Sequence, residues 1–258
     1  MCFEWDAVPP DLPPDLSRGR VAGGAAAELL ELEAADGARF SAAFAGAADP
    51  QGPAVVVDPD VRGLYRFYVE LTERFAAAGH HAIAIDYFGR TAGLGPRDEG
   101  FDYMPHVPQT RSEQIQMDTA AAIEAVAGRT GERRAVTVGF CFGGGESFLA
   151  TTNNSLALAG AVGFYAGLDR SKWGEGLDSP LDRARYMHGP LLGLFGGADE
   201  GIPAEMLDEF KRRLDRAGVE NEIHVYPGAP HSFFDRKQDE YAEISEDAWR
   251  RVLAFLSR

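Results

Sequence analysis

Cysteine and basic residues are both scarce in this chain. Cys2 and Cys141 are the only cysteines among 258 residues, which excludes a framework of several disulfides and favours a reducing compartment. The 25 Lys and Arg are outnumbered by 40 Asp and Glu, so the formal net charge is −15. Because nucleic acids and anionic membranes are bound through basic patches, we expect neither as a partner.

Long apolar runs are missing as well. No stretch approaches the length of a membrane span, and Glu4 and Asp6 stand where a secretory signal would be basic. These absences predict a cytoplasmic protein. The sequence also has no cluster of His, Cys and Asp at metal-ligand spacing, so we expect neither a metal nor an organic cofactor. Nothing in the sequence specifies an oligomeric state.

The chain then divides into an extended start and one α/β domain. Four prolines between positions 9 and 14 predict that residues 1–25 lie extended on the surface of a single domain formed by residues 26–258. Residues 26–44 are expected to form two antiparallel strands around the Asp36-Gly37 turn. Further along, short apolar strands alternate with amphipathic helices, which predicts a mostly parallel central sheet with helices on both faces. The expected strands are residues 54–57, 82–85, 135–138, 159–164, 191–195 and 222–226.

A glycine-rich turn follows the third of these strands and contains Gly139-Phe-Cys-Phe-Gly143. A strained strand–turn–helix of this kind, a nucleophile elbow, has room only for small residues two positions before and after the reactive residue. Cys141 is therefore the candidate nucleophile, exposed in the turn, where the positive end of the helix dipole favours the thiolate. The Phe142 N–H points to where an oxyanion would form. The alternative is a buried, inert cysteine.

Two further groups follow Cys141 in the chain order in which α/β-hydrolases place their acid and their histidine. Asp199 stands in a tight loop after the strand at 191–195, where it is the candidate acid, and Glu200 is its nearest substitute. An ordinary turn or helix N-cap role is the alternative for Asp199. His231 lies on the loop after the last expected strand and is the candidate general base.

The segments around these three residues resemble the dienelactone hydrolase family over about residues 53–258. The motifs that carry the resemblance are Gly-Phe-Cys-Phe-Gly-Gly at 139–144, Gly-Gly-Ala-Asp-Glu-Gly-Ile-Pro at 196–203 and Pro-Gly-Ala-Pro-His-Ser-Phe at 227–233. The resemblance implies an α/β-hydrolase fold and hydrolysis of a small-molecule ester or lactone. It further implies a cysteine thioester intermediate, with Cys141, His231 and Asp199 as the catalytic triad.

The resemblance also implies a second oxyanion donor after the first parallel strand, which is the Val61 N–H in this chain. In the family a glutamate just before this donor pairs with the resting cysteine. Asp60, one methylene shorter, takes that position here. Asp60 is therefore the expected resting-state partner of Cys141.

The substrate side of the resemblance is less complete. The family's type enzyme holds a substrate carboxylate with two arginines, and Asp235 stands in the place of one of them. An anionic Asp235 in the pocket predicts a preference for neutral esters or lactones. The candidates for a replacement cation are Arg90, Arg97, Arg111 and Arg236.

Aromatic side chains and the neighbours of His231 complete the expected site. Ser232 and Phe233 follow His231 directly and are expected to contact the substrate. An aromatic pocket is one interpretation of the remaining rings, and core packing is the other. The residues concerned are Phe140, Phe142, Phe233, Phe234, Tyr87, Phe88, Tyr103 and Trp173.

Other functions also fit a cysteine elbow. Glutamine amidotransferases share Gly-x-Cys-x-Gly, but a glutamate stands two residues after their late histidine, where this chain has Phe233. A general carboxylesterase acting on aromatic esters would use the same triad. A non-catalytic binding or redox-sensing protein would keep the fold and one reactive thiol without turnover.

Overall fold

The first two strands form the expected hairpin. The computed structural model describes residues 5–16, 26–95, 97–174, 177–235 and 239–258. In it, β1 (Glu28–Glu33) pairs antiparallel with β2 (Arg39–Ala45). Gly37 has a φ of +83°, a conformation that glycine adopts at little cost, and this closes the tight turn between them.

Six further strands extend the hairpin into one eight-stranded sheet, in the order β1-β2-β4-β3-β5-β6-β7-β8. Each pair from β4 to β8 is parallel, and β2 joins β4 antiparallel. The side chains of β3 to β7 are buried throughout, as expected for strands covered on both faces. These strands are β3 (Ala54–Asp58), β4 (Ala82–Ile85), β5 (Ala135–Phe140), β6 (Gly160–Phe164), β7 (Leu191–Gly196) and β8 (Asn221–Tyr226).

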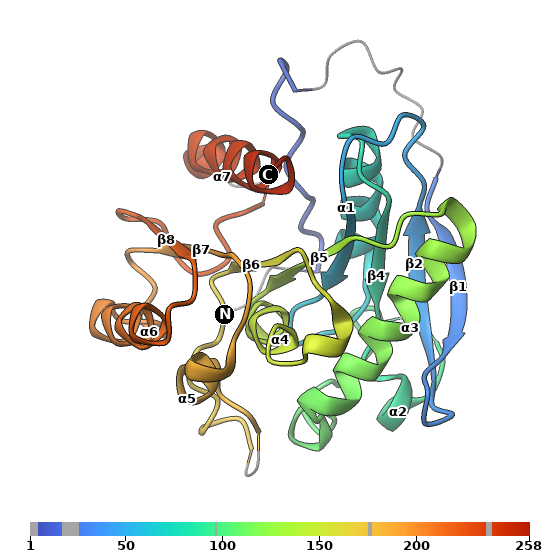
Figure 1. Ribbon diagram of the computed structural model, residues 1–258, viewed down its shortest axis with the longest axis horizontal. Helices are drawn as coiled ribbons and strands as arrows, with labels where there is room; N and C mark the ends of the chain where they lie inside the picture. Colours follow the sequence, from blue (N-terminus) through green and yellow to red (C-terminus); the bar gives the residue numbers. More distant parts are fainter. Residues whose placement is uncertain (1–4, 17–25, 96, 175–176, 236–238) are drawn as a thin grey trace.

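Helices cover both faces of the sheet, which confirms the predicted α/β architecture (Figure 1). They are α1 (Arg66–Ala77), α2 (Gly89–Ala92), α3 (Ser112–Thr130), α4 (Phe142–Ala150), α5 (Pro180–Arg183), α6 (Ala204–Ala217) and α7 (Ala242–Leu256), with 3-10 turns at 107–109, 154–156, 184–186 and 239–241. Figure 1 shows α1 and α7 on one side of the sheet and α3, α4 and α6 on the other. Leu71 of α1 packs in one cluster with Val55 and Val57, whereas Ile115 of α3 packs with Val56. Successive side chains of β3 therefore pack alternately into two hydrophobic clusters.

The chain before the sheet lies along the surface of this framework. Residues 5–16 form turns and extended backbone beside α7, as four closely spaced prolines predict. The expected boundary near residue 25 lies outside the described residues.

The parallel strands all end at the same edge of the sheet, and the loops that follow β3, β5, β6, β7 and β8 meet there. In open α/β sheets this edge is where ligands bind.

Candidate active site

Cys141 occupies a strained turn between β5 and α4. Its φ of +54° and ψ of −111° lie outside the regions that residues with a side chain ordinarily adopt. A Cβ on Gly139 would overlap the Gly143 carbonyl, and a Cβ on Gly143 would overlap the carbonyls of Asp58 and Pro59. The predicted requirement for small residues around an elbow is therefore met. The expected exposure of the thiol is wrong: Cys141 is only 3% exposed, although it lines a pocket.

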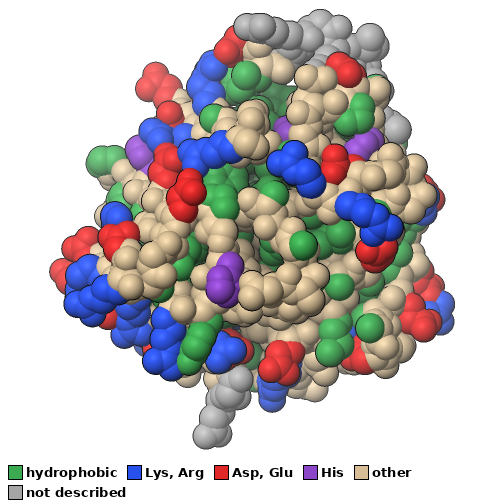
Figure 2. Space-filling view, viewed as in Figure 1, with side chains coloured by type: hydrophobic (Ala, Val, Ile, Leu, Met, Phe, Trp, Pro, Cys, Tyr) green, Lys and Arg blue, Asp and Glu red, His purple; other side chains and the backbone are tan. Residues whose placement is uncertain are grey.

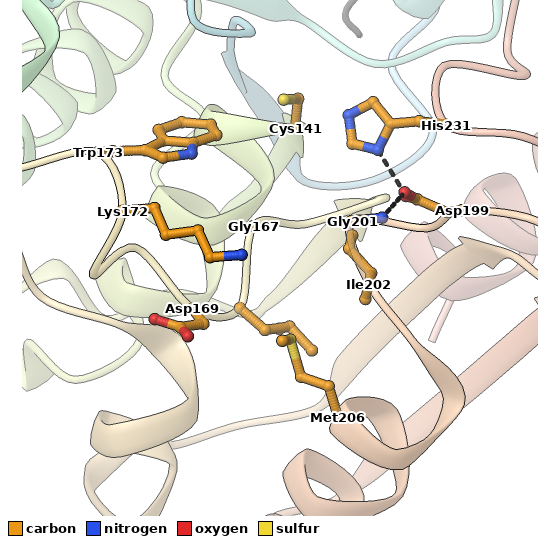
Figure 3. A pocket seen from close by; sticks show the side chains of 11 residues that line it. Cys141, Gly167, Asp169, Lys172, Trp173, Asp199, Gly201, Ile202, Met206 and His231 are labelled. Atoms are coloured by element: carbon orange, nitrogen blue, oxygen red, sulfur yellow. Dashed lines mark hydrogen bonds and ion pairs between the residues drawn. The ribbon is translucent and has the colours of Figure 1, made fainter.

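Asp199 and His231 reach one another from neighbouring strand ends. The Asp199 carboxylate (Oδ2) lies 2.6 Å from Nδ1 of His231, and its Oδ1 accepts a hydrogen bond of 2.9 Å from the Gly201 N–H. Asp199 is 8% exposed, and hydrogen bonds to both of its carboxylate oxygens hold it in place. The other ring nitrogen of His231 is turned toward the side on which Cys141 lies, and the Cys141 sulfur points toward Trp173 in this view (Figure 3).

Two backbone amides lie on either side of the elbow. Asp58, the last residue of β3, pairs with Gly139 of β5, so Val61 and Phe142 follow adjacent strand ends. Among the described residues neither the Val61 nor the Phe142 N–H donates a hydrogen bond. A hydrogen bond of 2.9 Å from the Asp60 N–H to the Tyr68 hydroxyl holds the loop before Val61 in place. Unpaired amides held in place are what an oxyanion hole requires.

Cys141, Asp199 and His231 line one pocket of about 300 Å³. Its described lining residues are Cys141, Gly167, Leu168, Asp169, Lys172, Trp173, Asp199, Gly201, Ile202, Met206 and His231. Lys172 extends across it, opposite the dyad of Asp199 and His231 (Figure 3). Sequence reasoning missed Lys172 and Asp169. The only signal that could have found them is their position after β6, whose carboxyl end lies at the functional edge of the sheet.

The comparison with known proteins decides the family. The model of the dienelactone hydrolase family matches residues 40–258. The chain belongs to the dienelactone hydrolase family. Relatives described as putative carboxymethylenebutenolidases include one from Escherichia coli, 30% identical over 213 residues that cover 80% of this chain and 77% of that protein. Another, from Methylorubrum extorquens, is 28% identical over 211 residues that cover 78% and 70%.

A solved structure agrees with this assignment. The crystal structure of a putative dienelactone hydrolase from Klebsiella pneumoniae has 28% identity and a TM-score of 0.76, covering 91% of this chain and all of that chain. The protein is therefore a hydrolase with the α/β-hydrolase fold, as the sequence motifs indicate. Within the part of the chain that the structure describes, no helix has the length and apolar character to cross a membrane. No group of three or more His, Cys, Asp or Glu side chains there is arranged to hold a metal ion.

Asp60, at the family's glutamate position, is engaged by a neighbour. The guanidinium of Arg62 donates to both Asp60 oxygens, with Nε 3.0 Å from Oδ1 and Nη2 2.6 Å from Oδ2. Asp60 is fully buried, and the side chain of Arg62 is 4% exposed. The pairing of Asp60 with the resting Cys141 stays a prediction, and it would require Asp60 to exchange Arg62 for the thiol.

Ser232 and Phe233 lie behind His231 rather than in the pocket. Ser232 is buried and has a φ of +61°, a conformation that makes a sharp turn directly after His231. The Phe233 ring is fully buried and packs at 5.2 Å from the Tyr226 ring and at 5.4 Å from the Tyr165 ring. Of the aromatic residues expected to line a pocket, Trp173 lines this one, and the other candidates are not among its described lining residues. Core packing explains most of them.

Asp235 also lies away from the pocket. It is 4% exposed, accepts a hydrogen bond of 3.0 Å from the Val8 N–H and is not among the pocket's described lining residues, so its expected place in the pocket is wrong. The preference for neutral substrates stays a prediction. Three candidate arginines have other partners. Arg90 binds Asp36 and Asp118, Arg97 binds Asp86, and Arg111 binds the carbonyls of Pro108 and Thr110. Arg236 lies outside the described residues.

A buried cluster of charged side chains contacts the elbow. The side chains of Glu146 on α4 and Arg170 are paired, and Arg170 Nη2 donates at 2.5 Å to the Phe142 carbonyl. The Arg170 guanidinium also lies 4.2 Å from the centre of the Phe142 ring. Burial, and next the nearby Glu146 carboxylate, raise the pKa of Asp58 well above its ordinary value, while Arg170 opposes this shift. The Arg170 guanidinium therefore interacts electrostatically with two buried carboxyl groups, those of Glu146 and Asp58.

Proposed function

We propose that the protein hydrolyses a small-molecule ester or lactone through a thioester on Cys141, with His231 as general base and Asp199 as the acid that orients it. The observation that carries this proposal is the shared pocket. A strained elbow presents the thiol to the same 300 Å³ cavity that holds the 2.6 Å Asp199–His231 pair. A nucleophile, a base and an oriented acid drawn from three strand ends are the parts that acyl transfer needs.

The first half-reaction forms the thioester. The Cys141 side chain turns toward the imidazole, and Nε2 of His231 accepts the thiol proton. The thiolate then attacks the substrate carbonyl carbon, and the carbonyl oxygen takes up the negative charge. The Val61 and Phe142 N–H groups stabilise this oxyanion, each by about 2.7–4 kcal/mol. When the tetrahedral intermediate collapses, the C–O bond breaks and protonated His231 gives its proton to the leaving alkoxide.

The second half-reaction releases the acid. His231 takes a proton from water, and the resulting hydroxide attacks the thioester carbonyl in the same oxyanion site. Collapse breaks the C–S bond, and the proton on His231 returns to the sulfur. The Asp199 carboxylate accepts the hydrogen bond from Nδ1 and so favours the Nδ1–H tautomer, which leaves Nε2 for the reacting atoms. These steps require no metal or organic cofactor, which stays a prediction, as does the cytoplasmic location.

Replacement of Cys141 tests the proposal. Cys141→Ala should lower the hydrolysis of p-nitrophenyl acetate by at least about 10³-fold, because it removes the sulfur that carries the acyl group in the proposed thioester. Cys2→Ala is the matched control, since it removes the chain's other cysteine and should leave the rate within twofold of the native rate. Circular dichroism verifies that both variants fold. Turnover by Cys141→Ala at a native rate would contradict the proposal and show that another group is the nucleophile, whereas a native protein that hydrolyses no ester would favour the redox-sensing interpretation.

A further inference from the structure

Hydrogen bonds and an ion pair hold residues 5–16 against α7. The Trp249 indole on α7 donates a hydrogen bond of 3.2 Å to the Pro10 carbonyl. Arg250, also on α7, forms two hydrogen bonds of 2.6 and 2.7 Å with the Asp15 carboxylate. In Figure 1 this stretch runs beside α7 toward the middle of the molecule. It precedes the part of the chain that the family model matches, which starts at residue 40.

The other end of this segment reaches the loop after β3. The Arg62 guanidinium lies between two aromatic rings, 5.0 Å from the centre of the Trp5 ring and 4.3 Å from that of Tyr65. The two rings meet edge to face at 5.2 Å. Because the side chain of Arg62 is only 4% exposed, Trp5 forms part of the cover that keeps water from the guanidinium.

The pair that Trp5 covers brackets the candidate oxyanion donor. Asp60 and Arg62 flank Val61 in the chain, and the Arg62 backbone N–H also donates to Asp60 Oδ1 at 2.9 Å. The turn that presents the Val61 N–H is therefore closed by three hydrogen bonds onto one carboxylate. An ion pair shielded from water is stronger than the same pair in water, so its cover affects how firmly the turn is held.

We propose that Trp5 is a positioning residue for catalysis: by covering the Arg62–Asp60 pair, it holds the Val61 N–H in the orientation that an oxyanion requires. The inference rests on the proposed function, since it assigns the N-terminal segment a role in that same site. Donors contribute to catalysis only when they are already oriented before charge develops. Without the indole, water reaches Arg62, the ion pair is screened, and the Val61 peptide samples orientations that do not point into the site.

Trp5→Ala, Trp5→Phe and Asp15→Asn test this inference in the full chain. With p-nitrophenyl acetate, Trp5→Ala should lower kcat about 5- to 20-fold, less than the 10²–10³-fold cost of removing a whole donor. KM should stay within twofold, because the amide acts on the developing charge. Trp5→Phe should recover most of kcat, since a second ring still covers the guanidinium. Asp15→Asn is the matched control that loosens the same segment at α7, and its kcat should stay within twofold.

The rate of Cys141 alkylation by iodoacetamide separates positioning from general damage. Alkylation uses the same thiol but forms no oxyanion, so it should stay within twofold in Trp5→Ala. The inference is overturned if Trp5→Ala keeps the native kcat, if kcat and alkylation fall together, or if Asp15→Asn lowers kcat as much. Should Trp5→Ala fail to fold, a native kcat in Trp5→Leu would overturn it and a lowered one would support it. The failure of the proposed function is distinct, because it shows itself as full activity in Cys141→Ala.

Discussion

Lys172 is the single residue that most changes the expected view of the substrate. It is the one Lys or Arg among the described residues that line the pocket, and its charge interacts with that of Asp169, which also lines it. The sequence predicts Asp235 as an anion in the pocket, but its carboxylate accepts a hydrogen bond from the Val8 N–H of the N-terminal segment instead. A cation therefore lines the pocket in which an anion was expected.

Lys172→Met should weaken turnover of a carboxylate-bearing ester more than turnover of its methyl ester. Because Lys172 is exposed, the contact is worth no more than about 0.2–1 kcal/mol, so we expect a two- to fivefold selective loss in kcat/KM for the acid. Lys211→Met is the matched control, since it removes the same charge from the α6 surface, where Lys211 pairs with Asp215. Equal losses for the acid and the ester, or the same selectivity in Lys211→Met, would show that Lys172 does not contact the carboxylate.

At the scale of elements, β3 ends at Asp58, a carboxyl group that is buried next to α4 and costly to ionise. The raised pKa of Asp58 means that the folded protein resists losing this proton, whereas the unfolded chain loses it near pH 3.8. The contribution of Asp58 to the free energy of unfolding is therefore fully present below that pH and is lost as the pH rises through the folded-state pKa. Its two oxygens have no hydrogen-bond partner among the described residues.

Asp58→Asn should thus stabilise the protein more at pH 8 than at pH 5. Asparagine keeps the shape but has no proton to lose, so its advantage grows as the native carboxyl is forced to ionise. Urea unfolding at the two pH values measures the difference. Asp208→Asn, on the exposed face of α6, is the control and should show no such trend. An equal effect of Asp58→Asn at both pH values would mean that Asp58 titrates normally in the folded protein.

Elements that depend on local pattern could be predicted from the sequence, and those that depend on tertiary packing could not. Alternating apolar strands and helices predicted the sheet, and the close glycines predicted the turn at Cys141. The loop after β6 carries Lys172 and has no periodicity, so only the folded chain shows that it enters the pocket. Phe233 looked like a substrate contact because it stands near His231, but the turn at Ser232 directs its ring into the core.

At the scale of the whole molecule, the formal net charge is −15. Figure 2 shows acidic and basic side chains intermixed on the face it presents, with basic ones grouped over α5 and α6. There Arg185, Arg213 and Arg216 line a shallow hollow away from Cys141. We expect the field of this net charge to act on a substrate mainly during its approach, over a screening distance of about 8 Å at physiological salt.

The whole fold serves to bring one thiol, one imidazole and one carboxylate from three strand ends to a single pocket. The central claim is that the thiol becomes acylated. Native protein mixed with p-nitrophenyl acetate, quenched in acid during the first turnovers and analysed by intact and peptide mass spectrometry, tests it directly. The account predicts one acetyl group, mapped to the peptide that contains Cys141, removable by hydroxylamine and absent in Cys141→Ala. Steady turnover with no acetyl on Cys141, or with acetyl on another residue instead, would contradict it.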